Sequence, residues 1–234
     1  MKIIDKNVLI TGGASGIGKI MGKIALDKGA KSLIIWDVNQ ASLDATALEF
    51  NSRERVHTYK VDITNSDLVA TTYQRVKDEC GNVDILINCA GIVRGNNTFD
   101  QQTIQDIRLT FEVNTIAPMV ITQLILPDML QRNCGHICNI ASAGGMLGNP
   151  KMSVYGASKW AVIGWSESMR IELQQQKSNV HVTTVAPYFI STGMFRGVRS
   201  IFPILKPEPT AKKIIRAIER NTIFAGIPFG YHFI

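Results

Sequence analysis

Short runs of β-branched and other apolar residues alternate along this chain with longer segments in which apolar residues recur at helical spacing. The short runs predict strands at Val8–Ile10, Ser32–Trp36, Val56–Val61, Val83–Asn88, Gly135–Ala141, Val180–Val185 and Thr222–Ile227. The longer segments predict helices at Ile17–Lys28, Gln40–Phe50, Ser66–Glu79, Ile104–Leu130, Ser153–Gln176 and Thr210–Glu219. Strands that are apolar on both sides, each followed by a helix, are typical of a parallel sheet covered on both faces.

No linker divides the chain, so residues 1–234 are predicted to form one domain. The expected fold is α/β, with a doubly wound, mostly parallel seven-stranded sheet of the Rossmann type. A long stretch without a clear period, Pro187–Pro209, follows the sixth predicted strand at the edge where such sheets bind ligands. We therefore expect a substrate lid at about residues 188–209, with Phe195 lining the pocket; a loop packed permanently on the core is the alternative.

Charge and cysteine usage narrow the classes of function. The 234 residues carry a net charge of +6, but Lys and Arg are scattered along the chain and only Lys212 and Lys213 are adjacent. This favours a solvated basic surface and argues against a nucleic-acid partner. The four cysteines form no Cys-x-x-Cys pair and no cluster with histidine, which predicts reduced thiols and no metal site.

Neither a signal peptide nor a membrane span is predicted. The first strand is expected to begin by Asn7, and no apolar run approaches the ~20 residues that a membrane-spanning helix needs. We therefore expect a soluble, cytoplasmic protein. The apolar segment Ile223–Ile234 is interpreted as a final strand followed by a truncated terminus.

The first predicted strand leads into a glycine-rich turn, Thr11-Gly12-Gly13-Ala14-Ser15-Gly16-Ile17-Gly18. The glycines at positions 12, 16 and 18 lack Cβ atoms, so the backbone can approach a pyrophosphate at the positive end of the following helix. Their spacing differs from G-x-G-x-x-G, so the prediction depends on the flanking strand and helix. The turn predicts a dinucleotide cofactor.

Asp37 follows the second predicted strand, nineteen residues beyond Gly18. A carboxylate at this place accepts hydrogen bonds from both hydroxyls of the adenosine ribose and repels a 2′-phosphate. An Arg or Lys at position 15 of the turn would compensate for this repulsion, but the residue there is Ser15. Lys19 is the nearby cation. NAD is therefore favoured over NADP, and a helix N-cap is the alternative role for Asp37.

Tyr155 and Lys159 lie four residues apart on a predicted helix, so both side chains share one face. A free phenol has a pKa near ~10, and a nearby ammonium together with an oxidised nicotinamide ring would stabilise the phenolate. Tyr155 would then exchange the proton of a substrate oxygen while a hydride moves to or from the nicotinamide. Ser142, at the end of the fifth strand, would hydrogen-bond the same oxygen, and Asn114 would bind a water that links Lys159 to solvent.

A Tyr-x-x-x-Lys pair by itself fits an ordinary amphipathic helix equally well. Ser142 and the glycine turn favour the catalytic interpretation. The histidines at positions 57, 136, 181 and 232 have no carboxylate or metal spacing that would support a hydrolase triad, and they are interpreted as surface or satisfied side chains.

In combination these motifs resemble the classical short-chain dehydrogenase/reductase superfamily, from about Lys6 to the end of the chain. The resemblance implies a catalytic tetrad of Asn114, Ser142, Tyr155 and Lys159. It also implies a set of cofactor contacts: Thr11, Gly12, Ser15, Gly16, Ile17, Gly18, Asp37, Asp62, Ile63, Asn88, Ala90, Gly91, Tyr155, Lys159, Pro187, Ile190 and Thr192. We expect Ser142, Tyr155 and Phe195 to contact the substrate.

Two positions depart from the superfamily pattern. Cys89 replaces the usual Asn in Asn88-Cys89-Ala90-Gly91, where we expect a packing change at most. Tyr188 replaces the Gly that usually follows Pro187. The segment after Pro187, together with Phe111–Asn114, is similar to the branch that holds retinol and hydroxysteroid dehydrogenases. That similarity implies a lipophilic secondary alcohol or a retinoid-like primary alcohol as substrate.

We therefore expect an NAD-dependent dehydrogenase or reductase that acts on an apolar alcohol or ketone of steroid, retinoid or long-chain type. An NADPH-dependent 3-oxoacyl-thioester reductase and a non-catalytic NAD-binding protein are the alternatives. Asp37 argues against the first, and the intact catalytic set argues against the second. Trp160 and Trp165 on the Tyr155 helix predict a homodimer or homotetramer. Peripheral contact with a lipid surface, through the apolar tail and the basic surface, is an alternative that the sequence does not favour.

Overall fold

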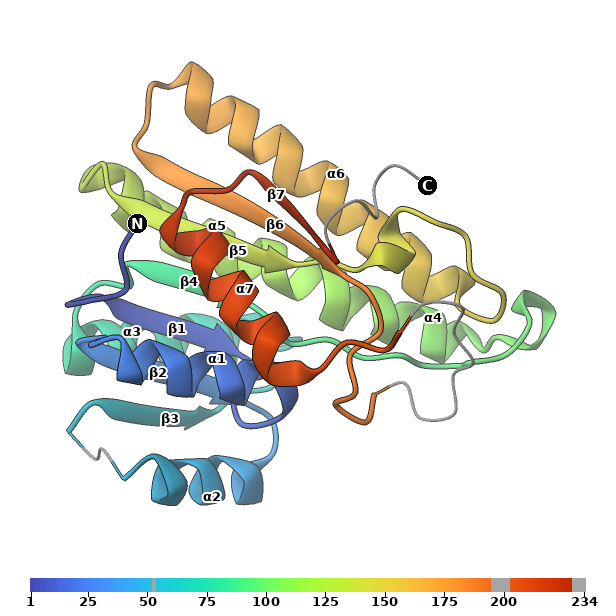
Figure 1. The fold of residues 1–234 in the computed structure, drawn as a ribbon, viewed down its shortest axis with the longest axis horizontal. Coiled ribbons are helices and arrows are strands. Elements are labelled where there is room, and N and C mark those ends of the chain that lie inside the picture. Colours follow the sequence, from blue (N-terminus) through green and yellow to red (C-terminus); the bar gives the residue numbers. More distant parts are fainter. Residues whose placement is uncertain (52–53, 195–202, 229–234) are drawn as a thin grey trace.

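Seven strands form one sheet in the order β3-β2-β1-β4-β5-β6-β7, and every neighbouring pair is parallel (Figure 1). The computed structural model describes residues 1–51, 54–194 and 203–228. The strands are β1 (Asn7–Thr11), β2 (Ser32–Asp37), β3 (Val56–Lys60), β4 (Ile85–Asn88), β5 (Gly135–Ile140), β6 (Val180–Pro187) and β7 (Phe224–Ile227). The helices are α1 (Gly16–Asp27), α2 (Gln40–Phe50), α3 (Ser66–Cys80), α4 (Ile104–Phe111), α5 (Ala117–Gln131), α6 (Ser153–Gln175) and α7 (Pro207–Glu219). Three short helical segments are η1 (Phe99–Gln101), η2 (Glu112–Ile116) and η3 (Ala143–Gly145).

The order of the strands confirms the predicted doubly wound fold. The chain runs outward from β1 through β2 to β3, returns to the centre, and then adds β4 to β7 on the other side of β1. The strand order therefore reverses between β1 and β4, and the carboxyl ends of these two strands border the crevice where such sheets bind ligands.

Alternate residues of the central strands point to opposite faces of the sheet and build two cores. On one face, Val8 and Ile10 of β1 lie in a buried cluster with α1, α2 and α7. On the other face, Leu9 lies in a cluster with α3, α5 and α6 (Figure 1). All three side chains are fully buried, as expected for a parallel sheet covered on both sides.

One predicted boundary differs clearly from the structure. The last described helix, α7, begins at Pro207 and not at Thr210. The fixed φ of proline and its missing N–H are compatible with the first turn of a helix, so Pro207 and Pro209 both fit there. The expected lid over residues 188–209 therefore loses its last three residues to α7, and residues 195–202 lie outside the described part of the chain.

The long helix predicted at Ile104–Leu130 is present but is not uniform, because the π-helical segment η2 separates α4 from α5. A π turn inside an α-helix often marks a functional site. By length and composition the run Ile104–Gln131 is apolar enough to cross a membrane. The prediction that no run approaches this length was therefore wrong. Ile121, Ile125 and Met129 are fully buried against the sheet, so α5 serves here as a core helix.

Candidate active site

The turn between β1 and α1 is built so closely that only glycine fits at its key positions. Gly12 has a φ of +66°, and a Cβ there would lie 2.9 Å from the Ala90 Cα that follows β4. A Cβ at Gly18 would overlap the backbone carbonyl of Gly12. The first turn of α1 carries no acidic residue, and Ser15 makes no side-chain cap. The N–H groups at this helix end thus suit an anionic group such as a pyrophosphate.

Two predicted cofactor contacts have side chains that support the turn from inside. The buried Thr11 Oγ1 accepts hydrogen bonds from the two backbone N–H groups that follow Asn88, at 3.1 and 3.2 Å. The buried Asn88 Nδ2 donates to Asn139 Oδ1 at 2.8 Å and to Thr122 Oγ1 at 3.1 Å. Both side chains therefore fix the end of β4 beside β1. The predicted cofactor contacts of these two residues would be made by their backbone groups.

Asp37, at the end of β2, faces the glycine-rich turn. Its Oδ2 accepts a hydrogen bond from the Ala14 N–H at 3.2 Å, and its Oδ1 accepts one from the Asn39 N–H at 3.1 Å. Asn39 is the N-cap of α2, so the alternative in which Asp37 caps that helix was wrong. Lys19 forms an ion pair with Glu49 at 2.5 Å. The cation nearest to the turn in sequence is thus already neutralised.

The remaining predicted cofactor contacts border the same edge of the sheet. A Cβ at Gly16 would lie 3.6 Å from the Thr192 Cβ, so the chain after β6 passes over the glycine-rich turn. Pro187 ends β6, and Ile190 forms an isolated bridge with Leu205. The structure therefore brings the sixth strand and the first turn together, although almost the whole chain separates them in sequence.

The segment after β3 lies at the adjoining sheet edge. Asp62 is exposed, and its Oδ1 accepts hydrogen bonds from the Thr64 N–H and hydroxyl at 3.0 and 2.7 Å. Ile63 is buried against the core on the side of α3. The predicted adenine contact of this pair stays a prediction.

Ser142, Tyr155 and Lys159 are brought together from β5 and α6. Ser142 follows β5, and its Oγ accepts a hydrogen bond from the Gly144 N–H at 3.1 Å. Tyr155 and Lys159 are both buried, and Lys159 Nζ lies 5.9 Å from the centroid of the Tyr155 ring. Lys159 Nζ also donates to the Ile140 carbonyl at 2.9 Å. The predicted catalytic set thus forms one compact group at the carboxyl edge of the sheet.

Burial sets the protonation of this group. It raises the pKa of Tyr155 to about 12, and a hydrogen bond with the Ser142 side chain opposes that rise. Burial also lowers the pKa of Lys159 to about 8, with a smaller opposing effect from Cys89. The protein alone therefore keeps Tyr155 neutral. A further positive charge close to the phenol is needed to bring its pKa toward neutrality.

The side chain of Asn114, in the π-helical segment η2, is fully engaged with protein groups. Its Oδ1 accepts a hydrogen bond from the Ile92 N–H at 2.8 Å, and its Nδ2 donates to the Ile92 carbonyl at 2.9 Å and to Ser158 Oγ at 3.1 Å. Ser158 Oγ in turn donates to the Tyr155 carbonyl at 2.7 Å. Asn114 therefore holds the segment after β4 against the catalytic turn of α6, and the water link to Lys159 stays a prediction.

The sequence did not predict two residues of this arrangement, Ser158 and Thr115. Thr115 Oγ1 donates to the Ser158 carbonyl at 3.0 Å, and both side chains are buried. A serine placed between Tyr155 and Lys159 on a helix was the available signal, because its hydroxyl can reach the backbone three residues earlier. The pairing with η2 had no signal in the sequence.

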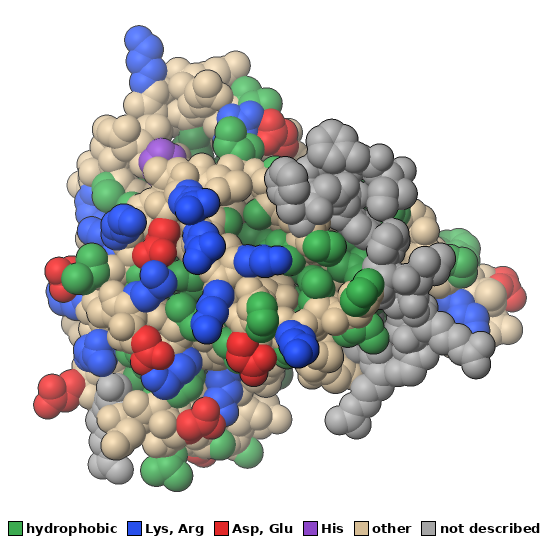
Figure 2. Space-filling model, viewed as in Figure 1, with side chains coloured by type: hydrophobic (Ala, Val, Ile, Leu, Met, Phe, Trp, Pro, Cys, Tyr) green, Lys and Arg blue, Asp and Glu red, His purple; other side chains and the backbone are tan. Residues whose placement is uncertain are grey.

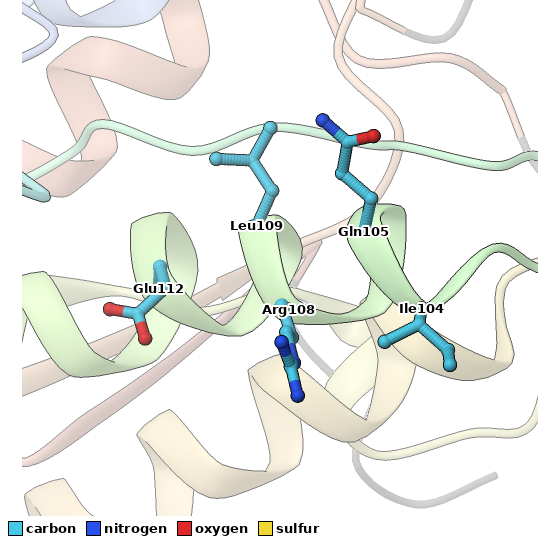
Figure 3. Close-up of a pocket in the computed structure, with 5 residues that line it drawn as sticks. All are labelled: Ile104, Gln105, Arg108, Leu109 and Glu112. Carbon is cyan, nitrogen blue, oxygen red and sulfur yellow. The ribbon is translucent and has the colours of Figure 1, made fainter.

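A separate hollow of about 440 Å³ lies along α4 (Figure 3). Its lining residues are Ile104, Gln105, Arg108, Leu109 and Glu112. In the close-up, Ile104, Arg108 and Glu112 project from one side of the helix, and Gln105 and Leu109 project from the other. None of them belongs to the catalytic set. The predicted pocket residue Phe195 lies outside the described residues.

A parallel sheet whose strand order reverses at a glycine-rich turn, with a buried Ser-Tyr-Lys group beside it, defines a nicotinamide-dependent oxidoreductase. Among the residues that the structure describes, no three His, Cys, Asp or Glu side chains form a group that could hold a metal ion. The family model for short chain dehydrogenases matches residues 6–201, and the chain belongs to that family. It is thus an oxidoreductase that acts on CH–OH groups, and the predicted resemblance is confirmed.

Several characterised proteins are similar over most of their length. The chain is 39% identical to epidermal retinol dehydrogenase 2 of Mus musculus over 235 residues, which cover 97% of this chain and 75% of that protein. It is 36% identical to estradiol 17-beta-dehydrogenase 11 of Homo sapiens over 222 residues, which cover 93% and 73% of the two chains.

Solved structures of the same fold hold either nicotinamide cofactor. A short chain dehydrogenase/reductase of Burkholderia phymatum in complex with NAD has a TM-score of 0.89 at 23% identity, covering 97% of this chain and 90% of that one. A short chain dehydrogenase of Burkholderia cenocepacia in complex with NADP has a TM-score of 0.86 at 25% identity, covering 100% and 92%. The fold therefore does not by itself decide between NAD and NADP.

Proposed function

We propose that this protein is an NAD-dependent dehydrogenase or reductase that interconverts a hydroxyl and a carbonyl group on an apolar, retinoid- or steroid-like molecule. The observation that carries the proposal is the buried Tyr155 phenol, which has the Ser142 hydrogen bond and the Lys159 ammonium beside it. This group lies at the same sheet edge as the glycine-rich turn.

In alcohol oxidation, the Tyr155 oxygen takes the proton of the substrate hydroxyl, and in reduction it returns that proton to the carbonyl oxygen. Ser142 donates a hydrogen bond to the same oxygen and holds it beside Tyr155. Lys159 stabilises the phenolate through its positive charge. When bound, the nicotinamide ring supplies the hydride acceptor or donor and a second positive charge.

The preference for NAD rests on two charges near the glycine-rich turn. The Asp37 carboxylate faces the turn and would repel a 2′-phosphate. Lys19, the cation that would otherwise attract such a phosphate, is paired with Glu49. Asp37→Asn tests this directly, because the amide keeps a hydrogen-bond acceptor for the turn but loses the charge.

We expect Asp37→Asn to lower kcat/KM with NAD about tenfold, since hydrogen bonds to a charged group contribute about 1.5–3 kcal/mol. The same change should raise kcat/KM with NADP. Asp44→Asn, on the exposed side of α2, is the matched control and should change neither value. An unchanged NAD/NADP ratio in Asp37→Asn would mean that another group selects the cofactor.

The apolar substrate is supported by the relatives, which are named for retinol and estradiol. It is also supported by half-buried apolar side chains in the segments after β4, β5 and β6: Val93, Met146, Leu147, Tyr188 and Phe189. The test is a panel of steroid, retinoid, long-chain and simple cyclic alcohols with NAD, followed by absorbance of the reduced nicotinamide. Turnover only with NADPH and a 3-oxoacyl thioester would overturn the proposal.

We also propose a homodimer formed through the outer face of α4 and α6. Ile104, Arg108 and Glu112 project from one side of α4 and η2 (Figure 3), and Ile116 follows at the same spacing of four residues. Ile104 is 70% exposed, and Trp160 on α6 is 55% exposed. Around a two-fold axis, Arg108 of one copy can face Glu112 of the other. Trp165 does not belong to this face, because it packs against the buried core.

Light scattering at micromolar concentration tests the dimer. Arg108→Glu should shift the protein to monomer, and adding Glu112→Arg should restore the dimer by exchanging the charges. A monomeric wild-type protein would contradict the proposed interface without affecting the proposed chemistry.

A further inference from the structure

The outer face of α7 is a row of cations. The inner side of this helix is buried in the core through Ala211, Ile214, Ile215 and Ile218. Its outer side carries Lys212, Lys213 and Arg216, and Arg220 follows at the end of the helix; all four are exposed. Because the helix is fixed by its buried side, the cations are held in one plane.

One exposed carboxylate, Glu208, lies a turn before Lys212 on α7, but it forms no ion pair with these cations. Two lysines of the adjacent α1 and the one at its C-cap are each ion-paired: Lys19 with Glu49, Lys23 with Asp27 and Lys28 with Glu219. Within the described ranges, the four cations of α7 and its end have no ion-pair partner. Figure 2 shows Lys and Arg side chains gathered over the face that α1 and α7 form. The four cations lie within nine consecutive residues, and the helix turns them toward one side.

Exposed apolar residues lie in the two segments that meet before α7. Ile204, just before the helix, is 45% exposed, and Met194, in the chain that leaves β6, is 47% exposed. The Leu205 N–H donates to the Phe189 carbonyl at 2.8 Å, so the segment that leads into α7 lies beside the chain that leaves β6. The apolar end of the face therefore sits at the carboxyl edge of the sheet, where the catalytic group lies.

We propose that this face, formed by α7 with Ile204 and Met194, docks on the surface of an anionic phospholipid bilayer. Cations on a helix face attract the negative lipid headgroups, and apolar side chains beside them insert at the boundary with the acyl chains. A nucleic acid would use the cations but would leave the two exposed apolar side chains without a partner. The combination of both features favours the bilayer.

Docking through this face places Ile204, at the carboxyl edge of the sheet, in the boundary between headgroups and acyl chains. The proposed interface does not depend on the identity of the substrate, and it lies on the opposite face of the sheet from the α4–α6 surface.

Vesicle flotation tests the proposal. The protein is mixed at low salt with vesicles of phosphatidylcholine alone, or of phosphatidylcholine with phosphatidylserine, and its partition coefficient is measured. We expect binding only to the phosphatidylserine vesicles, weakening as salt is added. Lys212→Gln/Lys213→Gln/Arg216→Gln should bind about a hundredfold more weakly, because each cation near a charged lipid surface contributes about a factor of five.

The matched control, Lys60→Gln/Arg75→Gln/Lys177→Gln, removes the same charge from exposed positions on β3, on α3 and just after α6, and should bind like the wild type. Ile204→Ser should weaken binding while the net charge is unchanged. Wild-type protein that stays in the soluble fraction would overturn the proposal. So would equal losses in the two triple variants, or retention on double-stranded DNA without vesicle binding. Because no turnover is measured, these outcomes are independent of the proposed activity.

Discussion

The two halves of the active site are held in place by different kinds of force. The glycine-rich turn is defined by backbone atoms so close that an added Cβ would overlap them, as at Gly12 and Gly18. The catalytic half is an assembly of side chains, with Tyr155 and Lys159 on α6 clamped through Ser158 to the π-helical segment η2. The first half binds by shape, whereas the second acts through buried charges and hydrogen bonds. Substitutions should therefore fail in different ways in the two halves.

The largest effect is expected in the catalytic half. Tyr155→Phe removes the proton donor and acceptor but keeps the ring, so kcat should fall by about 10²–10⁴. Cofactor affinity, measured by fluorescence titration, should stay nearly unchanged because the glycine-rich turn is intact. Tyr73→Phe loses a hydroxyl that is bonded to Asp128, away from the catalytic set, and should keep its turnover. A Tyr155→Phe enzyme with more than about a hundredth of the rate would contradict the acid–base role.

The second effect concerns the buried charge of the catalytic half. Burial lowers the pKa of Lys159 from 10.5 to about 8. Between these values the unfolded chain holds a proton that the folded protein has lost, so Lys159 makes the free energy of unfolding rise with pH. Tyr155 acts in the opposite direction above pH 10, because its pKa is raised to about 12. The buried thiols of Cys89 and Cys138 act in the same direction as Tyr155 above pH 9, because burial raises their pKa values, so the effect of Lys159 is measured as a difference between wild type and a variant that keeps these groups.

Lys159→Met should remove this rise. In urea unfolding, the difference between wild type and variant should grow by about 2 kcal/mol from pH 8 to pH 10, because the full slope of ~1.4 kcal/mol per unit applies only well between the two pKa values. The same substitution at the exposed Lys177 controls for the loss of a lysine. A difference that is flat across this window would show that Lys159 is not buried as a neutral amine at high pH.

The third effect is steric and belongs to the glycine-rich turn. Gly18→Ala places a methyl group against the carbonyl of Gly12, and overpacking of this kind lowers the free energy of unfolding by about 1–3 kcal/mol. Cofactor affinity should fall as well, because the turn must open. Gly164→Ala is the matched control, since a Cβ there meets no atom within 4 Å. It should stabilise α6 by up to about 1 kcal/mol. Equal melting temperatures for the two variants would refute the steric account.

The smallest effect concerns the clamp, the hydrogen bonds that join Ser158 of α6 to Asn114 of η2. Ser158→Ala leaves one N–H of the buried Asn114 amide without an acceptor, which lowers the free energy of unfolding by about 1 kcal/mol. It should also lower kcat and leave the KM for the cofactor unchanged, because the clamp positions Tyr155 and not the glycine-rich turn. Ser168→Ala, exposed on the same helix, should change neither quantity. A normal kcat in Ser158→Ala would reduce the clamp to a structural contact.

Much of the fold and of the candidate site was predictable from the sequence. Alternating apolar runs predicted the order of strands and helices, and the glycine spacing located the turn. Both signals depend on residues close together in the chain. The candidate catalytic pair, Tyr155 and Lys159, was predicted because both side chains share one helix face. Ser158 and η2 were not predicted as a clamp, because hydrogen bonds between distant elements leave no periodic signal.

The sequence by itself determined the fold class and the glycine-rich turn and indicated the candidate catalytic set, since each rests on local propensity or short spacing. Tertiary structure decided how these parts act together. It closed Thr192 over Gly16, paired Lys19 with Glu49, and tied Asn114 to Ser158. It also buried one side of α7 and so left its cations on the outer side. The physical reason is the same in each case: charge, burial and steric contact depend on distance in space, which residue order alone does not specify.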